Sequence, residues 1–426
     1  MQSSVSSNWR WSNLPAWTVW LFRVAVGAVF VISGWSKCID LWGFVFKIEE
    51  YLSAWHLSIW IPREVCILTA GTLSVTEFVT GVMLVTGSLR RVSVWYGCLL
   101  MAFMLPLTAY IAVADPIPDC GCFGDFLILS NTATFIKNIV LSAMLLALVV
   151  NNRRCAGLFP AALQWIVITL STAYVIIVGI VGLQVQPLLD FRPYPVGSRP
   201  AEAAEDVSEP MYVYSKDGQT RTFTLDALPD STWTYVGDVS GDTGQDTDRL
   251  EVYDADGEAA TDDVFDAEGD MAVLVIDNPA EQFLSRAHFN NELYQYLVDR
   301  GAGMAAVLGA RDSLGIARWK DLAVPRFEVY TADVTALRTL VRGNAALVYL
   351  RDGRILWKRS LMSIPPDTPL QPDPENILAS MQPVDDGYLH GLLTGVYIAL
   401  MMGVFLLGLS PKCLRIFSAC RFKKKS

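Results

Sequence analysis

The sequence predicts a polytopic α-helical membrane protein that carries one α/β domain outside the membrane. Three observations support this fold class. The 426-residue chain is 52% hydrophobic and only 18% charged, which is too apolar for an ordinary soluble protein of this size. Its apolar residues gather in runs long enough to cross a bilayer. Between the last two runs lie about two hundred residues, the size of a folded domain.

Six apolar runs have about the twenty residues that a helix needs to cross the hydrocarbon core. They are Trp17–Trp35, Val65–Thr86, Val92–Val113, Ala133–Val150, Leu163–Val185 and Gly387–Leu409. The first run is long and lacks a small-residue cleavage site, so we expect it to remain as an anchor. Membrane lipid is therefore the predicted surrounding of most of these helices.

Basic residues predict the orientation, because Lys and Arg are retained on the cytoplasmic side. They cluster in Arg90 and Arg91, in Arg153 and Arg154, and, after the sixth run, in Lys412, Arg415, Arg421 and Lys423 to Lys425. We expect a multi-pass protein of the bacterial inner (cytoplasmic) membrane with both termini cytoplasmic. The connections 37–64 and 115–132 and the large domain then face the periplasm.

The net charge of −10 is unevenly distributed. Residues 202–270 hold roughly twenty carboxylates and few basic residues, whereas the C-terminal tail is basic. This pattern argues against nucleic acid as a partner. Within the acidic segment, Asp254-x-Asp256-Gly257-Glu258 lacks the remaining ligands of a calcium loop, so we expect a turn there rather than a metal site.

The predicted outer domain begins after a linker at residues 193–210. Residues 211–270 show short alternating segments and turns, which predict a small β-rich region. From residue 271 the pattern changes to a buried strand (Ala272–Ile276), a helix (Phe289–Leu297), a second strand (Met304–Leu308) and another helix before Phe327. Strands that alternate with helices predict an α/β layer.

The domain ends in a helix (Val334–Val341) and a hairpin across Asp352-Gly353, and this ending resembles the C-terminal half of the thioredoxin fold. Thioredoxin-like enzymes carry Cys-x-x-Cys after the first long strand and a cis-proline before the hairpin. Here Asp277-Asn278-Pro279-Ala280 follows the strand, Ala345 stands at the proline position, and no cysteine lies between Cys155 and Cys413. We expect a domain without dithiol chemistry that binds or positions a client protein, with a purely structural cap as the alternative.

The predicted topology sorts the eight cysteines. Cys155, Cys413 and Cys420 would lie in the reducing cytoplasm and Cys98 within a span, where we expect packing roles. Cys120 and Cys122 lie in the outer loop. Thiols one residue apart close only a small strained ring, which makes a disulfide easier to reduce, and Gly121 supplies the backbone freedom. Lys37 could stabilise a thiolate there, whereas the flanking Asp119 and Asp125 would oppose it.

Three interpretations of this pair remain open: a redox-active dithiol, a static disulfide, or soft ligands for a copper or zinc ion. We expect no metal, because the three histidines lie far from the pair in sequence. Cys38 and Cys66 are expected at the outer ends of the first two spans. They could form a relay with the loop, or they could be unrelated packing residues.

Several motifs together resemble the DoxX/MauE family of small membrane proteins. The first span carries Arg23-x3-Gly27-x2-Phe30-x2-Ser33-Gly34-x2-Lys37-x2-Asp40, the second carries Glu77-x3-Gly81, and the loop carries Cys120-Gly121-Cys122-Phe123-Gly124. The resemblance covers residues 14–152, and the fifth span with residues 190–194 resembles the extension of longer, Bacteroidetes-type members. It implies a four-helix membrane core and thiol or sulfur redox chemistry by Cys120 and Cys122. MauE is associated with maturation of methylamine dehydrogenase and DoxX with a quinone-coupled thiosulfate oxidoreductase, so quinone is the candidate cofactor.

Two charges are expected inside the membrane. Arg23 and Glu77 each lie about 12 Å from the inner end of their span at 1.5 Å per residue, so we expect that they can pair. A charge in hydrocarbon is costly unless paired or hydrated. The two residues therefore form either a structural ion pair or part of a quinone or proton path.

The sequence thus predicts a thiol-disulfide or quinone-linked oxidoreductase that acts on an extracytoplasmic client. The alternative is a non-catalytic assembly factor whose outer domain recruits the client while the cysteines brace the fold. The expected domains are a DoxX/MauE-like core (1–158), a fifth helix with its extension (159–192), a linker (193–210), a β-rich region (211–270), a thioredoxin-like domain (271–386) and a sixth helix with its tail (387–426).

Overall fold

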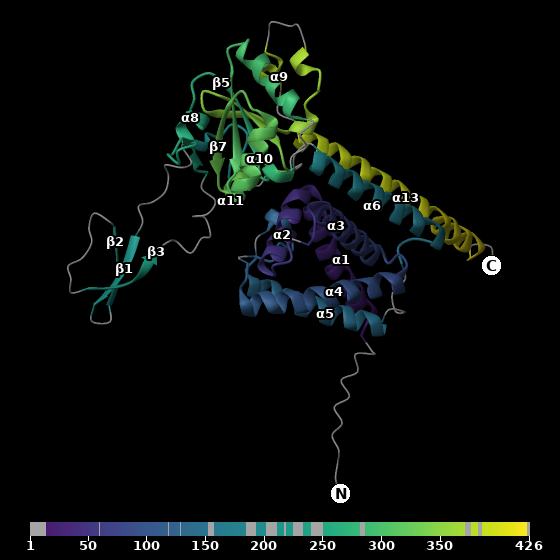
Figure 1. Ribbon diagram of the computed structural model, residues 1–426. Helices are drawn as coiled ribbons and strands as arrows, with labels where there is room; N and C mark the ends of the chain where they lie inside the picture. The colour runs from purple at the N-terminus through teal and green to yellow at the C-terminus, as the bar shows by residue number, and fades with distance from the viewer. Residues whose placement is uncertain are drawn as a thin grey trace. The chain divides into compact units, whose positions relative to one another are not determined.

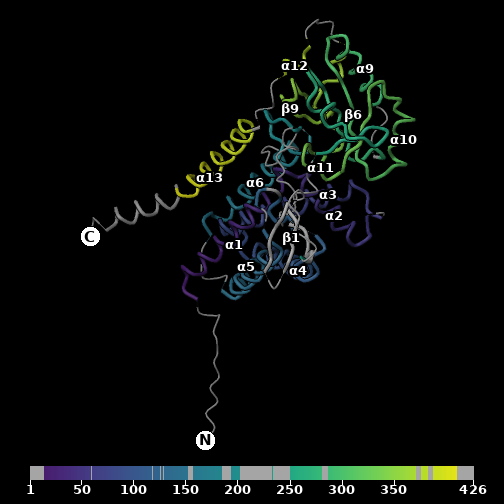
Figure 2. Tube along the Cα trace, turned by 90° about the vertical axis from the view of Figure 1, so that its left-hand side faces the viewer, coloured from purple at the N-terminus to yellow at the C-terminus, as the bar shows by residue number. Residues whose placement is uncertain are grey.

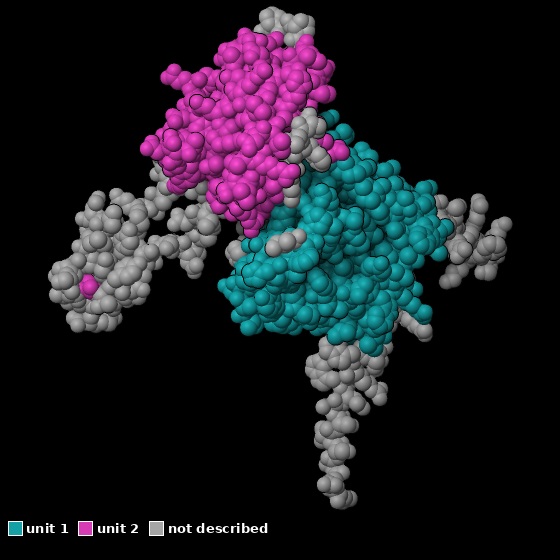
Figure 3. Space-filling view, in the orientation of Figure 1, with its two compact units in different colours: residues 1–183, 187–189, 386–426 teal, residues 184–186, 190–385 magenta. Residues whose placement is uncertain are grey.

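A computed structural model describes residues 14–58, 60–117, 119–127, 129–151, 157–184, 193–201, 211–216, 219–224, 233–239, 250–281, 286–370, 376–381 and 386–423. The chain divides into two compact units, which Figure 3 shows in different colours. Unit 1 contains residues 1–183, 187–189 and 386–426, and unit 2 contains residues 184–186 and 190–385. Arg153 and Arg154, residues 202–210 of the predicted linker and residues 190–192 lie outside the described part of the chain. In the described part of that linker, Tyr194 and Ala201 are buried in the core of unit 2, so residues 193–201 belong to the folded unit.

Unit 1 is helical, and the part of it that the structure describes contains six helices long and apolar enough to span a membrane. These are α1 (Ala16–Ile39), α3 (Arg63–Thr86), α4 (Arg90–Ala114), α5 (Asn131–Asn151), α6 (Ala161–Gln184) and the segment Gly387–Leu409 of α13 (Asp386–Lys423) (Figure 1). The six predicted spans are confirmed. Hydropathy predicts them well because the bilayer requires a length and composition that soluble helices seldom combine.

The helices α1 and α3 form the tightest contact of unit 1. Glycines on both helices meet the opposing backbone: a Cβ on Gly81 would lie 2.5 Å from Val31 N, and one on Gly34 would lie 2.7 Å from Ser74 O. Small residues let membrane helices approach closely and gain dispersion contacts. This contact fixes the register of α1 against α3, which decides which polar side chains meet.

Two other helix pairs complete the unit. The helices α4 and α5 pack on α1 through an apolar cluster that includes Val94, Met101 and Leu145. The helices α6 and α13 lie side by side, with the rings of Tyr174 and Tyr397 stacked at 4.3 Å (Figure 1, Figure 2). Hydroxyl pairs between the same two helices add specificity to this contact.

Exposed aromatic residues mark both ends of the spans. One group lies at the starts of α1, α4 and α6, and consists of Trp17, Trp20, Trp95, Tyr96 and Trp165. A second group lies at the opposite ends of the spans, and consists of Trp60, Tyr110 and Tyr388. Trp and Tyr concentrate at the two membrane–water interfaces, so their positions are those of a membrane-spanning bundle.

A helix that the sequence analysis treated as a loop follows α1. A single residue, Asp40, separates this helix, α2 (Leu41–Ala54), from the end of α1. The Asp40 side chain caps it by accepting a hydrogen bond of 2.9 Å from the backbone N–H of Gly43. Its apolar side packs on α3 in a cluster with Leu41, Val45 and Ala70. The helix was missed because it is amphipathic and too short to span.

Unit 2 contains a six-stranded mixed sheet of order β4-β7-β6-β5-β8-β9. The strands are β4 (Val252–Tyr253), β5 (Asp270–Ile276), β6 (Gly303–Gly309), β7 (Glu328–Ala332), β8 (Ala346–Arg351) and β9 (Arg354–Ser360). The three central strands β5, β6 and β7 are parallel, and β8 pairs antiparallel with both β5 and β9. The predicted α/β layer and its closing hairpin are confirmed, whereas β7 and β4 were not predicted.

Helices cover both faces of this sheet. On one face, α8 (Thr261–Phe265) and α11 (Val334–Leu340) pack on Val273 and Val275. On the other, α9 (Ala287–Val298), α10 (Ser313–Ala323) and α12 (Ile377–Ser380) pack on Leu274 and Ile276. The alternating residues of β5 are buried on both sides, as the continuous apolar run of a central parallel strand predicts.

A separate three-stranded sheet of order β2-β1-β3 confirms the β-rich region of unit 2. Its strands are β1 (Met211–Lys216), β2 (Gln219–Thr224) and β3 (Thr234–Val239), all antiparallel. The predicted turn at Asp256-Gly257 is also confirmed. There Asp254 Oδ1 accepts hydrogen bonds from the backbone N–H groups of Asp256 and Glu258.

Candidate functional site: a buried dithiol turn

The candidate site is the turn that connects α4 to α5. Its backbone folds tightly because Gly121 adopts a positive φ of 64° and donates its N–H to Asp119 Oδ1 at 2.7 Å. The chain turns again where Gly124 N–H donates to Gly121 O at 3.1 Å. This geometry brings the sulfur atoms of Cys120 and Cys122 to 2.7 Å from each other. Both residues are thiols rather than halves of a disulfide.

The dithiol turn (residues 119–124) is buried. Cys120 is 6% and Cys122 8% exposed. They share an apolar cluster with Ile111, Ile117 and Phe123. A sulfur in such surroundings is shielded from bulk reagents, so any exchange partner must either be small or wait until the turn opens.

Helix α2 holds the turn from one side. The Lys47 Nζ contacts Asp119 Oδ2 at 2.8 Å, and the Tyr51 hydroxyl donates to the carbonyl oxygen of Cys120 at 3.1 Å. The aliphatic part of Lys47 also lies directly against Gly121, where a Cβ would come within 2.6 Å of Lys47 Cγ. The negative charge of Asp119, which could have opposed a thiolate, is therefore compensated by Lys47.

A cluster of buried polar residues on α1 and α3 holds the turn from the other side. The Ser33 Oγ lies 2.5 Å from the carbonyl oxygen of Cys122 and 2.8 Å from Glu77 Oε1. The Lys37 Nζ donates to Glu77 Oε2 at 2.5 Å and to Ser33 Oγ at 3.2 Å. Ser33 therefore connects Cys122 by hydrogen bonds to the ion pair of Lys37 and Glu77.

The two thiols differ in acidity. The pKa of Cys120 is lowered to about 7, mainly because the Cys122 thiol donates a hydrogen bond to it. Burial opposes this shift, while Tyr51, Lys37 and Lys137 support it. The pKa of Cys122 is raised, because it is the donor and because it is buried. Near neutral pH Cys120 is therefore partly ionised, whereas Cys122 keeps its proton.

The comparisons with known proteins bear on this part of the chain. Residues 15–151 match the family model of the methylamine utilisation protein MauE. The matched region contains α1 to α5 and the dithiol turn. A second family model, described as a domain of unknown function (DUF8463), matches residues 209–240. No curated protein and no solved structure matches the chain.

Within this MauE-like region (residues 15–151), the structure brings most of the predicted site residues together. Lys37 and Glu77 lie beside the turn, and Phe123 and Gly124 belong to it. The Lys137 Nζ on α5 lies 4.3 Å from the centre of the Phe123 ring, a cation–π contact. Asp40 lies at the junction of α1 and α2, where it caps α2.

The expected pairing of Arg23 with Glu77 is wrong. Glu77 pairs with Lys37, and Arg23 Nε donates to the carbonyl oxygen of Leu84 near the end of α3 at 3.0 Å. The physical reason is the register of the two antiparallel helices. Gly27 faces Gly81 and Val85, so Arg23 lies beyond Val85 and far from the level of Glu77.

Cys38 and Cys66 belong to other apolar clusters of the unit than the turn does. Cys38 belongs to a cluster with Phe78 and Val178, and Cys66 to a different cluster with Leu41 and Ala70. Cys120 and Cys122 belong to a third. A relay among the four cysteines stays a prediction.

Four residues of the site were not selected from the sequence as site residues: Ser33, Lys47, Tyr51 and Lys137. A signal existed for three of them. Lys47, Tyr51 and Trp55 are spaced four residues apart, which places them on one face of a helix. Lys137 is a cation within a span, which is itself a reason to expect a function. Ser33 had no distinguishing signal beyond its place in the motif of the first span.

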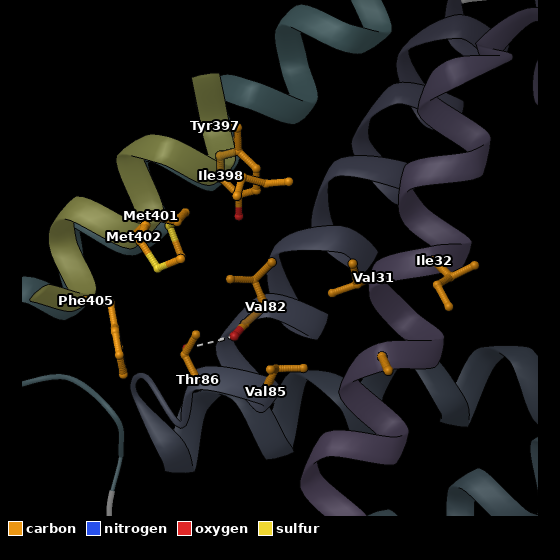
Figure 4. A pocket seen from close by; sticks show the side chains of 11 residues that line it. Val31, Ile32, Val82, Val85, Thr86, Tyr397, Ile398, Met401, Met402 and Phe405 are labelled. Atoms are coloured by element: carbon orange, nitrogen blue, oxygen red, sulfur yellow. Dashed lines mark hydrogen bonds between the residues drawn. The ribbon is translucent and has the colours of Figure 1, made fainter. Parts of the chain in front are cut away.

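An apolar groove lies elsewhere in unit 1, between α1, α3 and α13 (Figure 4). Its volume is about 500 Å³, and its lining includes Val31, Val82, Ile398 and Met401. The two polar groups of the lining already have partners. Thr86 Oγ1 donates to the carbonyl oxygen of Val82, drawn as the dashed line in Figure 4, and the Tyr397 hydroxyl pairs with Ser171.

Proposed function

We propose that this protein is a MauE-like membrane component of thiol-disulfide exchange, whose Cys120–Cys122 pair reacts with an extracytoplasmic client protein. The observation that carries the proposal is the geometry of the turn. Two sulfurs 2.7 Å apart, one of them with a pKa of about 7, form an arrangement that can open and close a disulfide. Family resemblance to DoxX/MauE proteins, with a four-helix core and redox chemistry, agrees with it.

The exchange needs no reagent other than the client disulfide. The Cys120 thiolate attacks one sulfur of that disulfide, which forms a mixed disulfide and releases the first client thiolate. Cys122 then loses its proton and attacks Cys120 Sγ, which closes the Cys120–Cys122 ring and releases the second client thiolate. The client gains two electrons and the pair loses two. The same steps in reverse oxidise a client dithiol. The small ring favours this reverse direction, because strain makes the Cys120–Cys122 disulfide easier to reduce.

The orientation follows from the number of spans and from the basic connections. The dithiol turn comes after the third span and unit 2 after the fifth, so both lie on the same side of the membrane. The positive-inside rule assigns that side to the periplasm and both termini to the cytoplasm of a bacterial cell. Oxidation of a client is favoured on this side, because the cytoplasm keeps thiols reduced.

Unit 2 is proposed to be a thioredoxin-like domain that holds the client without reacting. The segment after β5, where an enzyme of that fold carries its cysteines, is closed here by amide contacts. The Asn344 Nδ2 donates to Asn278 O at 2.8 Å, and Asn344 Oδ1 accepts from Asn278 N–H at 3.2 Å. Asp277 beside them is buried and paired with Arg338 at 3.2 Å. These contacts favour a rigid binding domain.

Quinone coupling, the expectation for a cofactor, is not supported by the groove of unit 1. An isoprenoid chain fits the volume and the apolar lining of the groove. A quinone ring also needs donors for its carbonyl oxygens, and both polar groups of the lining are engaged with neighbours. Electron transfer through a quinone in this groove is therefore not part of the proposed function.

The second candidate function is a non-catalytic assembly factor. The burial of both sulfurs favours it, because a pair that never becomes accessible would only brace the loop between α4 and α5. The same unit 2 would then recruit the client, and the cysteines would not change state.

Thiol labelling separates the two functions. The full-length protein in detergent is titrated through a series of glutathione redox buffers without denaturant and then labelled with a maleimide that adds mass. Under the first function, labelling of Cys120 and Cys122 rises with reduction, and replacing both with serine abolishes client oxidation. Cys98→Ser on α4 is the control and leaves both results unchanged. A pair that no buffer or reagent reaches before unfolding would establish the second function instead.

A further inference from the structure

Tyr51 occupies a distinctive position at the dithiol turn. It extends from α2 into the apolar cluster of the two cysteines, and its ring lies 5.8 Å from that of Trp55. Its hydroxyl donates to the carbonyl oxygen of Cys120 at 3.1 Å. The sulfur of the same residue belongs to the apolar cluster that the Tyr51 ring packs against, so Cys120 offers the hydroxyl a second acceptor once its thiol ionises.

Ionisation of Cys120 changes the relative strength of these acceptors. A thiolate is a charged acceptor, and hydrogen bonds to ionised groups are roughly twice as strong as those to neutral ones. A small rotation of the hydroxyl moves its proton from the carbonyl oxygen to the sulfur. The phenol remains available as a donor, because burial raises the pKa of Tyr51 and the neighbouring Cys120 adds to the shift.

The cations around the turn act on both sulfurs. Lys37 from α1 and Lys137 from α5 both favour the thiolate at Cys120 and at Cys122. Glu77 from α3 is paired with Lys37. Asp119 of the turn and Glu50 of α2 are both paired with Lys47. Besides the thiol of Cys122, the group that lowers the pKa of Cys120 and not that of Cys122 is the Tyr51 hydroxyl.

We propose that Tyr51 selects Cys120 as the attacking sulfur, by donating a hydrogen bond to its thiolate in a pocket where the neighbouring cations serve both cysteines alike. Tyr51 is thus a further functional residue of the exchange reaction, and the inference rests on the proposed function. It also assigns the order of attack: Cys120 reacts with the client and Cys122 resolves the mixed disulfide.

The test is the pH profile of alkylation. The reduced full-length protein reacts with iodoacetamide over pH 5 to 10, and mass spectrometry reports modification of Cys120 and Cys122 separately. Tyr51→Phe keeps the ring and its contact with Trp55 but removes the hydroxyl. The control is Tyr110→Phe, because Tyr110 also contacts Trp55. We expect Tyr51→Phe to raise the midpoint for Cys120 by about one pH unit or more, the size of one charge-assisted hydrogen bond. The control leaves the midpoint unchanged.

A purely structural role gives a different result. If Tyr51→Phe only loosens the turn, alkylation becomes faster at every pH and the midpoint stays in place, which overturns the proposal. Preferential alkylation of Cys122 in the parent protein overturns it as well. The proposed function is judged independently by redox cycling: a shifted midpoint together with a pair that never exchanges with a client would uphold the role of Tyr51 in thiolate formation and refute the exchange reaction.

Discussion

The ion pair of Lys37 and Glu77 is a residue-scale feature that only tertiary structure explains. Lys37 is fully buried, and Glu77 is largely so. A buried charge is tolerated when its partner and further hydrogen bonds replace the lost water, and Ser33 supplies one such bond. The pair therefore holds α1 and α3 together at the level where the dithiol turn touches them.

Removal of one member of this pair tests that role. Lys37→Met leaves Glu77 without its counter-charge, so we expect a loss of about 3–5 kcal/mol in the free energy of unfolding, the usual cost of breaking a buried ion pair. The double variant Lys37→Met/Glu77→Gln removes the orphaned charge and recovers part of that loss. Denaturation of the purified protein in mixed micelles measures both. Equal losses in the single and double variants would show that the two charges are not coupled.

Gly121 is the second residue-scale feature, because it combines a positive φ with contact against Lys47. In Gly121→Ala the left-handed backbone costs about 1–2 kcal/mol, and the new Cβ displaces the Lys47 chain from Asp119. We expect the turn to lift from α2 and Cys120 to be alkylated faster without denaturant. Gly124→Ala is the matched control, because Gly124 has a φ of 57° but open space around the new Cβ, whose nearest atom is Ser36 O at 3.9 Å. Equal rates in the two variants would contradict a specific role for the Lys47 contact.

At the scale of elements, the contact between α1 and α3 positions the site, because it sets which side chains of the two helices meet. Ser33 and Lys37 of α1 reach Glu77 of α3 only in the register that the facing glycines allow. A displacement by one helical turn, about 5.4 Å, would separate these groups. The glycines therefore serve the site although none of them touches a sulfur.

This packing predicts a contrast between two glycines of the bundle. Gly34→Ala drives a methyl group into the backbone of α3 at Ser74 and Phe78, and we expect it to cost about 1–3 kcal/mol, as overpacking does. Gly71→Ala, on α3 itself, places its Cβ 3.9 Å from Leu41, in ordinary contact, and should be neutral or slightly stabilising. Thermal midpoints in detergent compare the two. A larger loss for Gly71→Ala would contradict the proposed register.

The elements also show what the sequence alone can predict. The six spans, the α/β alternation of unit 2 and its closing hairpin follow from hydrophobic period and run length, which are local properties. Helix α2 was missed because its charged residues, Lys47, Glu49 and Glu50 among them, make it too polar for a span, and β7 because five residues carry too little pattern. The cysteine pair was selected from its spacing. Tyr51 and Lys47 were not, because their importance depends on where α2 folds.

At the scale of the whole molecule, the chain joins a helical membrane unit to a soluble-type sheet domain through two spans. The register between helices explains why the predicted pairing of Arg23 with Glu77 is wrong. Composition can place the two residues at similar depths, but the offset between two helices is set by the steric fit of their surfaces. The same reasoning applies to sidedness. The expectation that the dithiol turn and unit 2 lie on one side of the membrane depends on the number of predicted spans, whereas the choice of compartment depends on the basic connections alone.

Cysteine labelling from one side of the membrane tests this arrangement. Thr132→Cys lies near the dithiol turn, Ala255→Cys lies in unit 2, and Arg91→Cys lies in the first turn of α4; all three positions are exposed. In intact spheroplasts, we expect a membrane-impermeant maleimide to label the first two variants and not the third. The first two positions follow the third and the fifth span and therefore lie on one side, whereas the third position follows the second span and lies on the other. The parent protein supplies the background labelling of its own cysteines. Labelling of Arg91→Cys alone would place the turn in the cytoplasm, where glutathione would keep Cys120 and Cys122 reduced and the exchange reaction would have no oxidised partner.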